Sequence, residues 1–545
     1  MQDEYGWTPL AYASYYGRLE IVELLINDPR LLVNLDNNYG ETPFYLAVSQ
    51  GKKEIVKLLL KNENVDVHKE NRGGYSPFVR ACTSDHYEVV ELLLKDKRFD
   101  LTMENRHGET AFYSACWKGK LETVKLMLKH ETVDINKINN FGQTPLMIAF
   151  QNAYFEIVEL LLSDSRINNI DLGEKLGGTQ LRYSTFYGKT EIIQLMLKNK
   201  HVDINKPGEY GRTPLMRACY NGLTEIVEML LREKRVKDVN LGDSSGKTAF
   251  YMACQKGYLD IVKFMLNNRN VDINKANRQG STPLAVACYY GFTEIVALLL
   301  DDKRICDIGL TNSLGETCFY ISSWRGYTEI LKLLLNSDKA EPNKPNLVGQ
   351  TPLMRASEEG HVSAIELFLN SPKIHNINAV DKLGKTAFHF ACKKGNSEVV
   401  KLFLKNQEVD INKQDHSGRT PLMTASSHDQ FEVVDLLLND PRLKDINSQN
   451  KKGQSTFSYA VFYGKDKIVQ VLLKYPQVDI NQKDFEGWTP LMHVASIGNL
   501  EIVKCLLESG RKIDIKAKNK EGKTALTIAK EKNHEEIVNL INSYK

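Results

Sequence analysis

The stretch GDSSGKTAF, residues 242–250, could bind a phosphate, because a Gly-Lys-Thr sequence after a Gly/Ser turn is typical of a nucleotide-binding P-loop. In a P-loop, backbone amides and the lysine contact the phosphates, and four residues separate the first glycine from the Gly-Lys pair. Only three residues separate Gly242 from Gly246. The spacing therefore argues against a nucleotide hydrolase.

The same letters recur at fixed intervals along the chain. GKTAF also occupies residues 384–388, and GKTAL occupies 522–526. A period of 34 or 35 residues is typical of a solenoid, in which each unit stacks only on its neighbours. Gly246 therefore opens a repeat and not a phosphate loop. Sixteen units begin at Gly6, Gly40, Gly74, Gly108, Gly142, Gly177, Gly211, Gly246, Gly280, Gly315, Gly349, Gly384, Gly418, Gly453, Gly487 and Gly522.

Each unit predicts two helices and a connection, as the unit 211–246 illustrates. Pro214 stands at a position that suits the first turn of a helix, where its missing N–H costs nothing. Gly222 can adopt the left-handed conformation that ends a helix. Residues 226–231 predict a second, more apolar helix, and the polar residues 232–245 predict an extended, hairpin-like connection.

These motifs resemble the ankyrin repeat family over nearly the whole chain. The resemblance implies an all-α solenoid of stacked helix-turn-helix units joined by hairpin-like loops. It also implies a single array over residues 1–545, with residues 518–545 as a polar C-terminal cap. The first unit, in contrast, has the composition of an interior repeat, so we expect its outer face to be open. The motifs are GWTPL at 6–10 and 487–491, GRTPL at 211–215 and 418–422, EIVELL at 20–25 and 156–161, and VDIN at 133–136 and 271–274.

The chain departs from the family pattern at regular places. The histidine that follows T-P-L in the family, and that ties adjacent repeats by hydrogen bonds, is kept only at His389. Ala153 replaces the glycine that ends the first helix, so we expect a deformed backbone there. The spacing of T-P-L units from Gly142 onward indicates a two-unit period of 69 residues. Methionine, which we expect to substitute by packing, replaces the histidine at Met147, Met216, Met354, Met423 and Met492.

The cysteines and histidines show no pattern that predicts chemistry. Six of the nine cysteines occupy one repeat position, where a small and slightly apolar side chain suits closely packed helices. The sequence contains no C-x-x-C, H-E-x-x-H or G-x-S-x-G motif. We therefore expect no catalytic residue, metal or cofactor, and no enzyme. The six cysteines are Cys82, Cys116, Cys219, Cys254, Cys288 and Cys392.

Composition narrows the function classes further. The 545 residues carry a net charge of +3, which predicts no nucleic-acid footprint by itself. No apolar run approaches the roughly 20 residues that span a bilayer, and MQDEYGWTPL lacks the features of a signal peptide. The cysteines are expected to be reduced thiols. These features favour a cytoplasmic protein without membrane insertion.

The resemblance implies that recognition lies on the concave side, built from loop tips and exposed first-helix positions. Seven units carry a large aromatic residue nine positions after the unit glycine, and Tyr, Trp and Arg are enriched at binding hot spots. Aromatic residues also occur at the predicted tips, at Tyr39, Phe141, Tyr210 and Phe485. The candidate partner-binding residues are Tyr15, Tyr16, Trp117, Phe186, Tyr187, Tyr220, Tyr289, Tyr290, Trp324, Arg325, Phe462 and Tyr463.

The resemblance implies a non-catalytic scaffold or adaptor that binds a protein or an extended peptide on the concave surface. No small-molecule substrate is expected. Two alternatives stay open: a regulatory segment of a larger protein, and a nucleic-acid-binding solenoid. A steep salt dependence of RNA or DNA binding would favour the second. The residues do not identify the partner or the oligomeric state.

Overall fold

The computed structural model describes residues 2–168, 188–198, 202–305 and 307–544. It divides into two compact units, Met1–Met252 and Ala253–Lys545. Regular structure in the described residues is helical, and one isolated antiparallel bridge joins Glu104 to Thr110. The all-α class is therefore confirmed, whereas one array over residues 1–545 stays a prediction.

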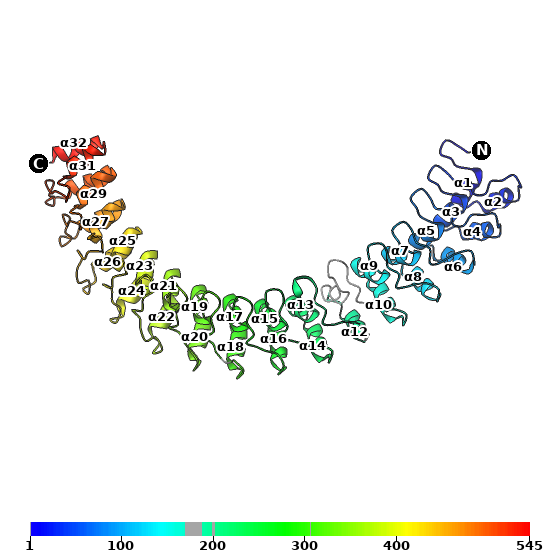
Figure 1. Ribbon diagram of the computed structural model, residues 1–545, viewed down its shortest axis with the longest axis horizontal. Coiled ribbons are helices and arrows are strands. Elements are labelled where there is room, and N and C mark those ends of the chain that lie inside the picture. Colours follow the sequence, from blue (N-terminus) through cyan, green and yellow to red (C-terminus); the bar gives the residue numbers. More distant parts are fainter. Residues whose placement is uncertain (1, 169–187, 199–201, 306, 545) are drawn as a thin grey trace. The chain divides into compact units, whose positions relative to one another are not determined.

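Each described repeat consists of two short helices followed by a loop (Figure 1). In the first unit, the first helices of the repeats are α1 (Pro9–Tyr16), α3 (Pro43–Ser49), α5 (Pro77–Ser84), α7 (Ala111–Trp117), α9 (Pro145–Gln151) and α13 (Pro214–Asn221). The second helices are α2 (Leu19–Ile26), α4 (Lys53–Leu60), α6 (Tyr87–Lys95), α8 (Leu121–Leu128), α10 (Phe155–Ser163), α12 (Thr190–Lys198) and α14 (Thr224–Arg232). A 3-10 turn, η1 (Glu209–Gly211), precedes α13, and α15 (Ala249–Lys256) spans the division between the units.

The second unit continues the same alternation. Its first helices are α17 (Pro283–Tyr290), α19 (Cys318–Arg325), α21 (Pro352–Glu359), α23 (Ala387–Lys394), α25 (Pro421–Ser427), α27 (Thr456–Phe462), α29 (Pro490–Ile497) and α31 (Ala525–Glu531). Its second helices are α16 (Leu259–Leu266), α18 (Thr293–Asp301), α20 (Thr328–Asn336), α22 (Val362–Leu369), α24 (Ser397–Lys405), α26 (Phe431–Leu438), α28 (Asp466–Leu473), α30 (Leu500–Leu507) and α32 (Glu535–Ser543).

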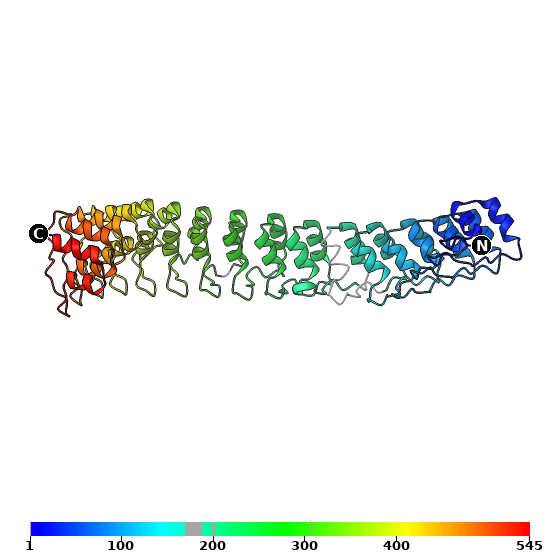
Figure 2. The same cartoon turned by 90° about the horizontal axis from the view of Figure 1, so that it is seen from above.

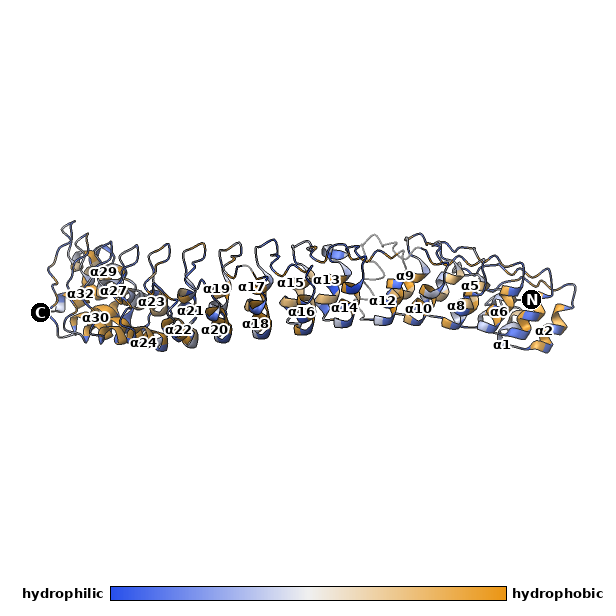
Figure 3. Ribbon diagram, turned by 90° about the horizontal axis from the view of Figure 1, so that it is seen from below, coloured by the Kyte–Doolittle hydropathy of each residue, from blue (hydrophilic) through white to orange (hydrophobic). Residues whose placement is uncertain are grey.

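The helices of each unit form two layers. Successive first helices contact one another, as α17 contacts α19 and α19 contacts α21, and successive second helices do the same. Figure 2 shows the loops on one side of the helices within each unit, and Figure 3 shows that the hydrophobic residues are concentrated on the helices. The core lies between the layers and between repeats, where residues such as Val22, Leu93 and Leu299 are buried.

The G-x-T-P-L motif begins each first helix by capping it. Thr213 has extended dihedrals, its hydroxyl accepts the N–H of Met216, and Pro214 occupies the first turn. The helix ends at Gly222, whose φ of 77° is left-handed. In the Gly-Lys-Thr stretch, Thr248 is buried and accepts the N–H of Tyr251 at 3.1 Å. Thr248 is therefore a helix cap, which confirms the repeat interpretation.

The VDIN sequence joins consecutive repeats. In 271–274, Val271 and Ile273 are buried, and Asp272 accepts the backbone N–H of Asn274. The Asn274 amide then donates to the carbonyl of Arg304 in the next repeat, at 2.7 Å. Asn412 and Asn447 bond in the same way to Arg442 and Gln477. The connection is thus a turn that hydrogen-bonds to its neighbour, and it forms no strand among the described residues.

The loop tips are tied by backbone hydrogen bonds. The N–H of Leu347 donates to the carbonyl of Leu314, that of Lys382 to Val348, and that of His416 to Leu383, at 2.9 to 3.2 Å. In each case the donor is the N–H of the residue two positions before a unit glycine. The acceptor is the carbonyl of the residue directly before the glycine of the previous unit. This arrangement fixes the spacing of neighbouring tips in each unit.

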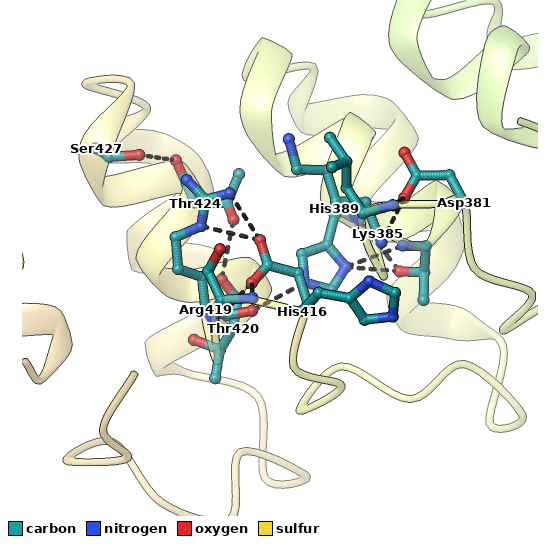
Figure 4. Close-up of polar contacts among 12 residues, drawn as sticks. Asp381, Lys385, His389, His416, Arg419, Thr420, Thr424 and Ser427 are labelled. Atoms are coloured by element: carbon teal, nitrogen blue, oxygen red, sulfur yellow. Dashed lines mark hydrogen bonds and ion pairs between the residues drawn. The ribbon is translucent and has the colours of Figure 1, made fainter. Parts of the chain in front are cut away.

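His389 ties two repeats together, as the family resemblance implies. It is fully buried, its Nδ1 accepts the N–H of Thr386 at 3.2 Å, and its Nε2 lies 3.2 Å from the carbonyl of Arg419 in the next repeat (Figure 4). Since Nδ1 is an acceptor, Nε2 carries the hydrogen and donates to Arg419. The sulfurs of Met147 and Met354 accept the equivalent threonine N–H at 3.3 Å, so methionine replaces one of these bonds as well as filling space.

Candidate interaction surface

The predicted aromatic residues stand at the C-terminal ends of the first helices. Tyr16, Trp117, Tyr290, Phe462, Tyr463 and Arg325 are exposed, and Tyr15, Tyr220, Tyr289 and Trp324 are half-buried. The expected exposure is therefore confirmed for six of these side chains and only partly for the other four. Phe186 and Tyr187 lie outside the described residues. Below, these helix ends and the adjacent loop tips are called the first-helix surface.

The densest group of candidate residues joins α17 to α19. The Tyr289 ring meets the Tyr290 ring edge-on at 5.0 Å and the Trp324 ring at 5.8 Å. The Arg325 guanidinium lies over the Tyr289 ring at 4.4 Å, and its Nε donates to the Tyr289 carbonyl at 3.2 Å. Residues from two repeats therefore form one fixed surface of rings and positive charge.

Arg355, in α21, extends this cluster and was missed by the sequence interpretation. Its guanidinium lies 5.3 Å from the centre of the Trp324 ring. It also pairs with Glu358 at 3.1 Å and with Glu359 at 2.9 Å. The spacing of three and four residues from Arg355 to the two acids is typical of helix ion pairs, so the sequence could have revealed the pairs with Glu358 and Glu359.

Glu358 is largely buried, although adjacent acidic residues at the end of a helix usually face solvent. Its side chain is only 14% exposed. It lies between Arg355 and Lys393, whose ammonium is 3.6 Å from its carboxylate. The cause is the stacking of α21 on α23, which brings a lysine of the next repeat to this acid. The central cluster continues into these two repeats as a chain of paired charges.

Phe462 and Tyr463 belong to a second cluster near the end of the chain. The Phe462 ring meets the Tyr463 ring at 5.2 Å and the His493 ring at 5.5 Å, both edge-on. His493 stacks on Trp488 at 5.2 Å, and its Nε2 lies 2.9 Å from Asp484. Burial lowers the pKa of His493 despite the nearby Asp484 carboxylate. The sequence interpretation missed Trp488 and His493, which occupy other positions of the repeat.

The candidate residues of the first unit form smaller groups. Tyr15 meets Tyr16 at 5.1 Å and Trp7 at 5.4 Å. The Lys118 ammonium lies 3.9 Å from the centre of the Trp117 ring. The Arg212 guanidinium lies 4.7 Å from the Tyr220 ring. In these places too, a ring at the end of a first helix is partnered locally, by another ring or by a cation.

The loop tips carry aliphatic as well as aromatic side chains. Tyr39, Phe141, Tyr210 and Phe485 are exposed at the tips, as the sequence predicts. Leu314, Leu347, Val348 and Leu383 are equally exposed at the same positions of three consecutive repeats. The prediction missed them because only aromatic residues were considered there. Exposed large apolar side chains in successive repeats favour contact with a partner.

The repeated cysteines lie in the core. Cys82, Cys116, Cys219, Cys254, Cys288 and Cys392 are all fully buried, which confirms their expected role. Burial raises the pKa of Cys82, so its thiol is protonated and unreactive at neutral pH. Within the described residues, no three His, Cys, Asp or Glu side chains are grouped to hold a metal ion. In the same residues, no helix has the length and apolar character to cross a membrane.

Comparison with known protein families supports the repeat assignment. Sequence patterns of ankyrin repeats match residues 27–105, 78–172, 234–312, 304–381, 353–450 and 457–545 in a three-copy form, and residues 1–47 and 196–250 in a many-copy form. The chain belongs to the ankyrin repeat family. Together, these matches cover far more than half of the chain.

Among similar proteins, the putative ankyrin repeat protein YahD of Escherichia coli K12 is 32% identical over 171 residues, which are 30% of this chain and 83% of YahD. The probable 26S proteasome regulatory subunit p28 of Saccharomyces cerevisiae is 32% identical over 140 residues, 25% of this chain and 60% of p28. The human transient receptor potential cation channel subfamily A member 1 is 28% identical over 176 residues, 30% of this chain and 15% of the channel. The chain thus spans most of YahD and only part of the other two.

Among solved structures, the ankyrin repeat domain of Bcl-3 has 26% sequence identity to this chain. The match covers 42% of this chain and 99% of the Bcl-3 domain, with a TM-score of 0.38. The crystal structure of EF0377, an ankyrin repeat protein, is 27% identical and covers 37% of this chain and 99% of its own, with a TM-score of 0.34.

Proposed function

We propose that this protein is a non-catalytic scaffold or adaptor that binds a protein or an extended peptide on its first-helix surface. Ankyrin repeats are generally protein-interaction modules, which supports the class of function. The observation that carries the proposal is the cluster of Tyr289, Tyr290, Trp324 and Arg325. No small-molecule substrate is required by this proposal.

The geometry of the central cluster suits binding. A side chain that is already held in place loses little conformational entropy when a partner is bound. Arg325 is held by the Tyr289 ring and carbonyl, and Trp324 is held between Tyr289 and Arg355. Tyr, Trp and Arg residues in fixed positions are the types that dominate binding energies. The cluster therefore offers a preformed contact area to a partner.

We propose in addition that the protein acts in the cytoplasm. The eight described cysteines are free thiols, and seven of them are buried. Free cysteines that fill a core agree with a reducing compartment. Microscopy of a tagged chain in the source cell would test this part, and exclusive secretion would contradict it.

The experiment for the proposed function is a comparative affinity capture from lysate, read by mass spectrometry. The first bait is the full chain, and the second carries Tyr289→Ser, Tyr290→Ser and Trp324→Ser. A matched control carries Tyr87→Ser and Phe431→Ser, two exposed aromatic residues on the second helices α6 and α26. Circular dichroism checks that all three baits are folded.

We expect one or more proteins to be captured by the first bait and by the matched control and to be lost with the triple variant. Such a result would locate the partner on the central cluster. Equal capture by all three baits would contradict a binding role for this cluster. Capture of nucleic acid alone, with a steep salt dependence, would favour the nucleic-acid alternative instead.

A further inference from the structure

Two hollows flank Phe462 on the first-helix surface of the second unit. The first has a volume of about 380 Å³, and its lining includes Arg419, Lys451, Lys452, Tyr459 and Tyr463. The second has a volume of about 280 Å³, and its lining includes Trp488, His493 and Ile497. Phe462 lines both hollows, so its exposed ring forms a shared wall.

The first hollow is positively charged. Lys451 and Lys452 are exposed at the tip of the loop before Gly453. Among the described residues that line this hollow, none is acidic. Arg419 is neutralised by the buried Asp415, which accepts its Nε–H at 2.9 Å and also bonds two backbone N–H groups. The two lysines therefore supply a net positive charge that is not balanced at the site.

The second hollow is mainly apolar. The stacked rings of Trp488 and His493 form one side, and Ile497 and Phe462 contribute exposed hydrophobic surface. Of its two carboxylates, Asp484 is engaged by His493 and by the N–H of Trp488 at 2.8 Å. Glu486 lies at the exposed rim, 3.6 Å from Lys520. An apolar side chain can thus enter this hollow without displacing a free charge.

We propose that the two hollows form one bipartite peptide site. A carboxylate side chain of an extended partner segment lies against Lys451 and Lys452, and a large apolar side chain of the same segment enters the hollow of Trp488 and Ile497. This proposal rests on the protein-binding function and names the class of partner: an acidic peptide with a neighbouring apolar residue. In an extended peptide, alternate side chains point to the same side and lie about 7 Å apart, so two such side chains can face two hollows that share the wall formed by Phe462.

Charge complementarity favours such a peptide over single-stranded nucleic acid. A nucleic acid would place phosphates along both hollows at regular intervals. The carboxylates of Asp484 and Glu486 line the second hollow and would repel a phosphate there. A peptide that carries its charge on one side only meets both hollows with matching chemistry.

The test uses the full chain and synthetic, fluorescein-labelled peptides in fluorescence anisotropy. Each peptide has Gly/Ser flanks, one Glu and one Leu, and zero to three serines between the two. Control peptides replace Glu by Gln or Leu by Ser. We expect at least one spacing to bind at least about tenfold more tightly than both controls, since a factor of ten is 1.4 kcal/mol.

Variants of the protein then assign each half of the peptide to a hollow. Lys451→Glu with Lys452→Glu is expected to abolish the preference for Glu over Gln. Ile497→Ser is expected to reduce the preference for Leu over Ser. Lys467→Glu with Lys474→Glu changes the net charge equally on exposed residues in and directly after α28, in the repeat that begins at Gly453, and is expected to leave binding unchanged. If the first charge reversal unfolds the chain, Lys451→Gln with Lys452→Gln replaces it.

Four results would overturn the proposal. One is that no spacing binds more tightly than the Gln control, and another is that the Lys451 and Lys452 variants bind unchanged. The third is that binding requires phosphoserine in place of Glu, and the fourth is that an oligo-dT strand binds better than every peptide. The variant of Tyr289, Tyr290 and Trp324 should bind the peptides normally. Failure of this site is therefore distinguishable from failure of the central cluster in lysate capture.

Discussion

The guanidinium of Arg442 donates a hydrogen bond of 2.7 Å to the backbone carbonyl of Leu404, in helix α24 of the preceding repeat. Asp440, two residues earlier, holds the guanidinium through two bonds of 3.0 and 3.1 Å. The carbonyls at the end of a helix lack partners within the helix. Arg442 therefore supplies one of the bonds that the last turn of α24 needs.

The same type of hydrogen bond recurs in every second repeat, so the two-unit period of the sequence corresponds to a recurring contact in the structure. Arg98 bonds to Leu60, Arg166 to Leu128 and Arg304 to Leu266, each 38 residues earlier. Lys373 serves the equivalent carbonyl, that of Leu335. One repeat of each such pair thus carries the cation, and the other carries the helix end that it caps.

Replacing Arg442 by Ala is expected to lower the free energy of unfolding by about 1–2 kcal/mol, because a charge-assisted hydrogen bond to a helix end is lost. Arg442→Lys is expected to lose less, since Lys373 makes the equivalent contact naturally. Urea denaturation followed by circular dichroism measures both variants. Equal losses for Ala and Lys would show that the charge at this position does not stabilise the repeat.

His389 is expected to make stability depend on pH. Burial lowers the pKa of His389 below its ordinary value of 6.5, so the unfolded chain binds a proton more readily than the folded chain. The contribution of the neutral His389 to the free energy of unfolding is therefore fully present above pH 6.5. As the pH falls below 6.5, the free energy of unfolding decreases by at most about 1.4 kcal/mol per pH unit. His389→Met, the residue found in five other repeats, should flatten this dependence.

The measurement for His389 is urea denaturation of both proteins between pH 7.5 and 5. The comparison concerns the slope with pH, because Met also removes the bond to Arg419 and changes stability at every pH. Asp415, which faces this region, has a pKa lowered below 3.8 and stays charged over the whole range. Identical slopes for the two proteins would contradict the expectation.

Ala153 has a left-handed backbone with φ of 59°, at a position where most repeats have glycine. A residue with a Cβ is strained there by roughly 1–2 kcal/mol. Ala153→Gly is expected to raise the free energy of unfolding by about 1 kcal/mol, because part of the gain is offset by chain entropy. Thermal unfolding measures the change.

The matched substitution is Gly119→Ala, at the same position one repeat earlier. Its φ is 69°, and an added Cβ would lie 2.7 Å from the ring of Tyr154. Gly119→Ala should therefore lower the melting temperature, whereas Ala153→Gly should raise it. Changes of the same sign for both would contradict this account of the turn.

Ile21 and Leu24 form an open apolar face on α2, with exposed fractions of 47% and 78%. Ile55 and Ile502, at the position of Ile21 in other repeats, are 2% and 0% exposed, because a preceding second helix covers them. Ile21→Gln is expected to change the melting temperature little, whereas Ile502→Gln should cost several kcal/mol through loss of burial and a buried amide. Thermal unfolding of the two variants provides the comparison. A similar loss for both would show that Ile21 is covered in solution.

Local features could be predicted well from the sequence. The capping role of Thr213, the burial of Cys219 and the left-handed turn at Gly222 all follow from residue type and position within one repeat. Ala153 keeps the left-handed conformation that the glycines adopt in other repeats, so the deformed backbone expected there is not found. These features depend on contacts between residues that are close in the chain, so the repeat pattern contains the necessary information.

Contacts between side chains of different repeats were harder to predict. Arg355 reaches Trp324, 31 residues earlier, and Lys393 reaches Glu358. Such contacts depend on the rotamers of long side chains across a helix boundary, which the pattern of one repeat does not specify. The hollows beside Phe462 arise in the same way, from residues of loops and helices that belong to different repeats.

The hydrogen bonds between loop tips hold each exposed tip residue at a fixed position relative to its neighbours. Leu314, Leu347 and Leu383 are presented by consecutive repeats, and each backbone is held to that of its neighbour. A substitution at one tip therefore changes one side chain of the row and leaves the backbone positions of the adjacent tips unchanged. Within each unit, the side chains that such a row presents can evolve independently of one another.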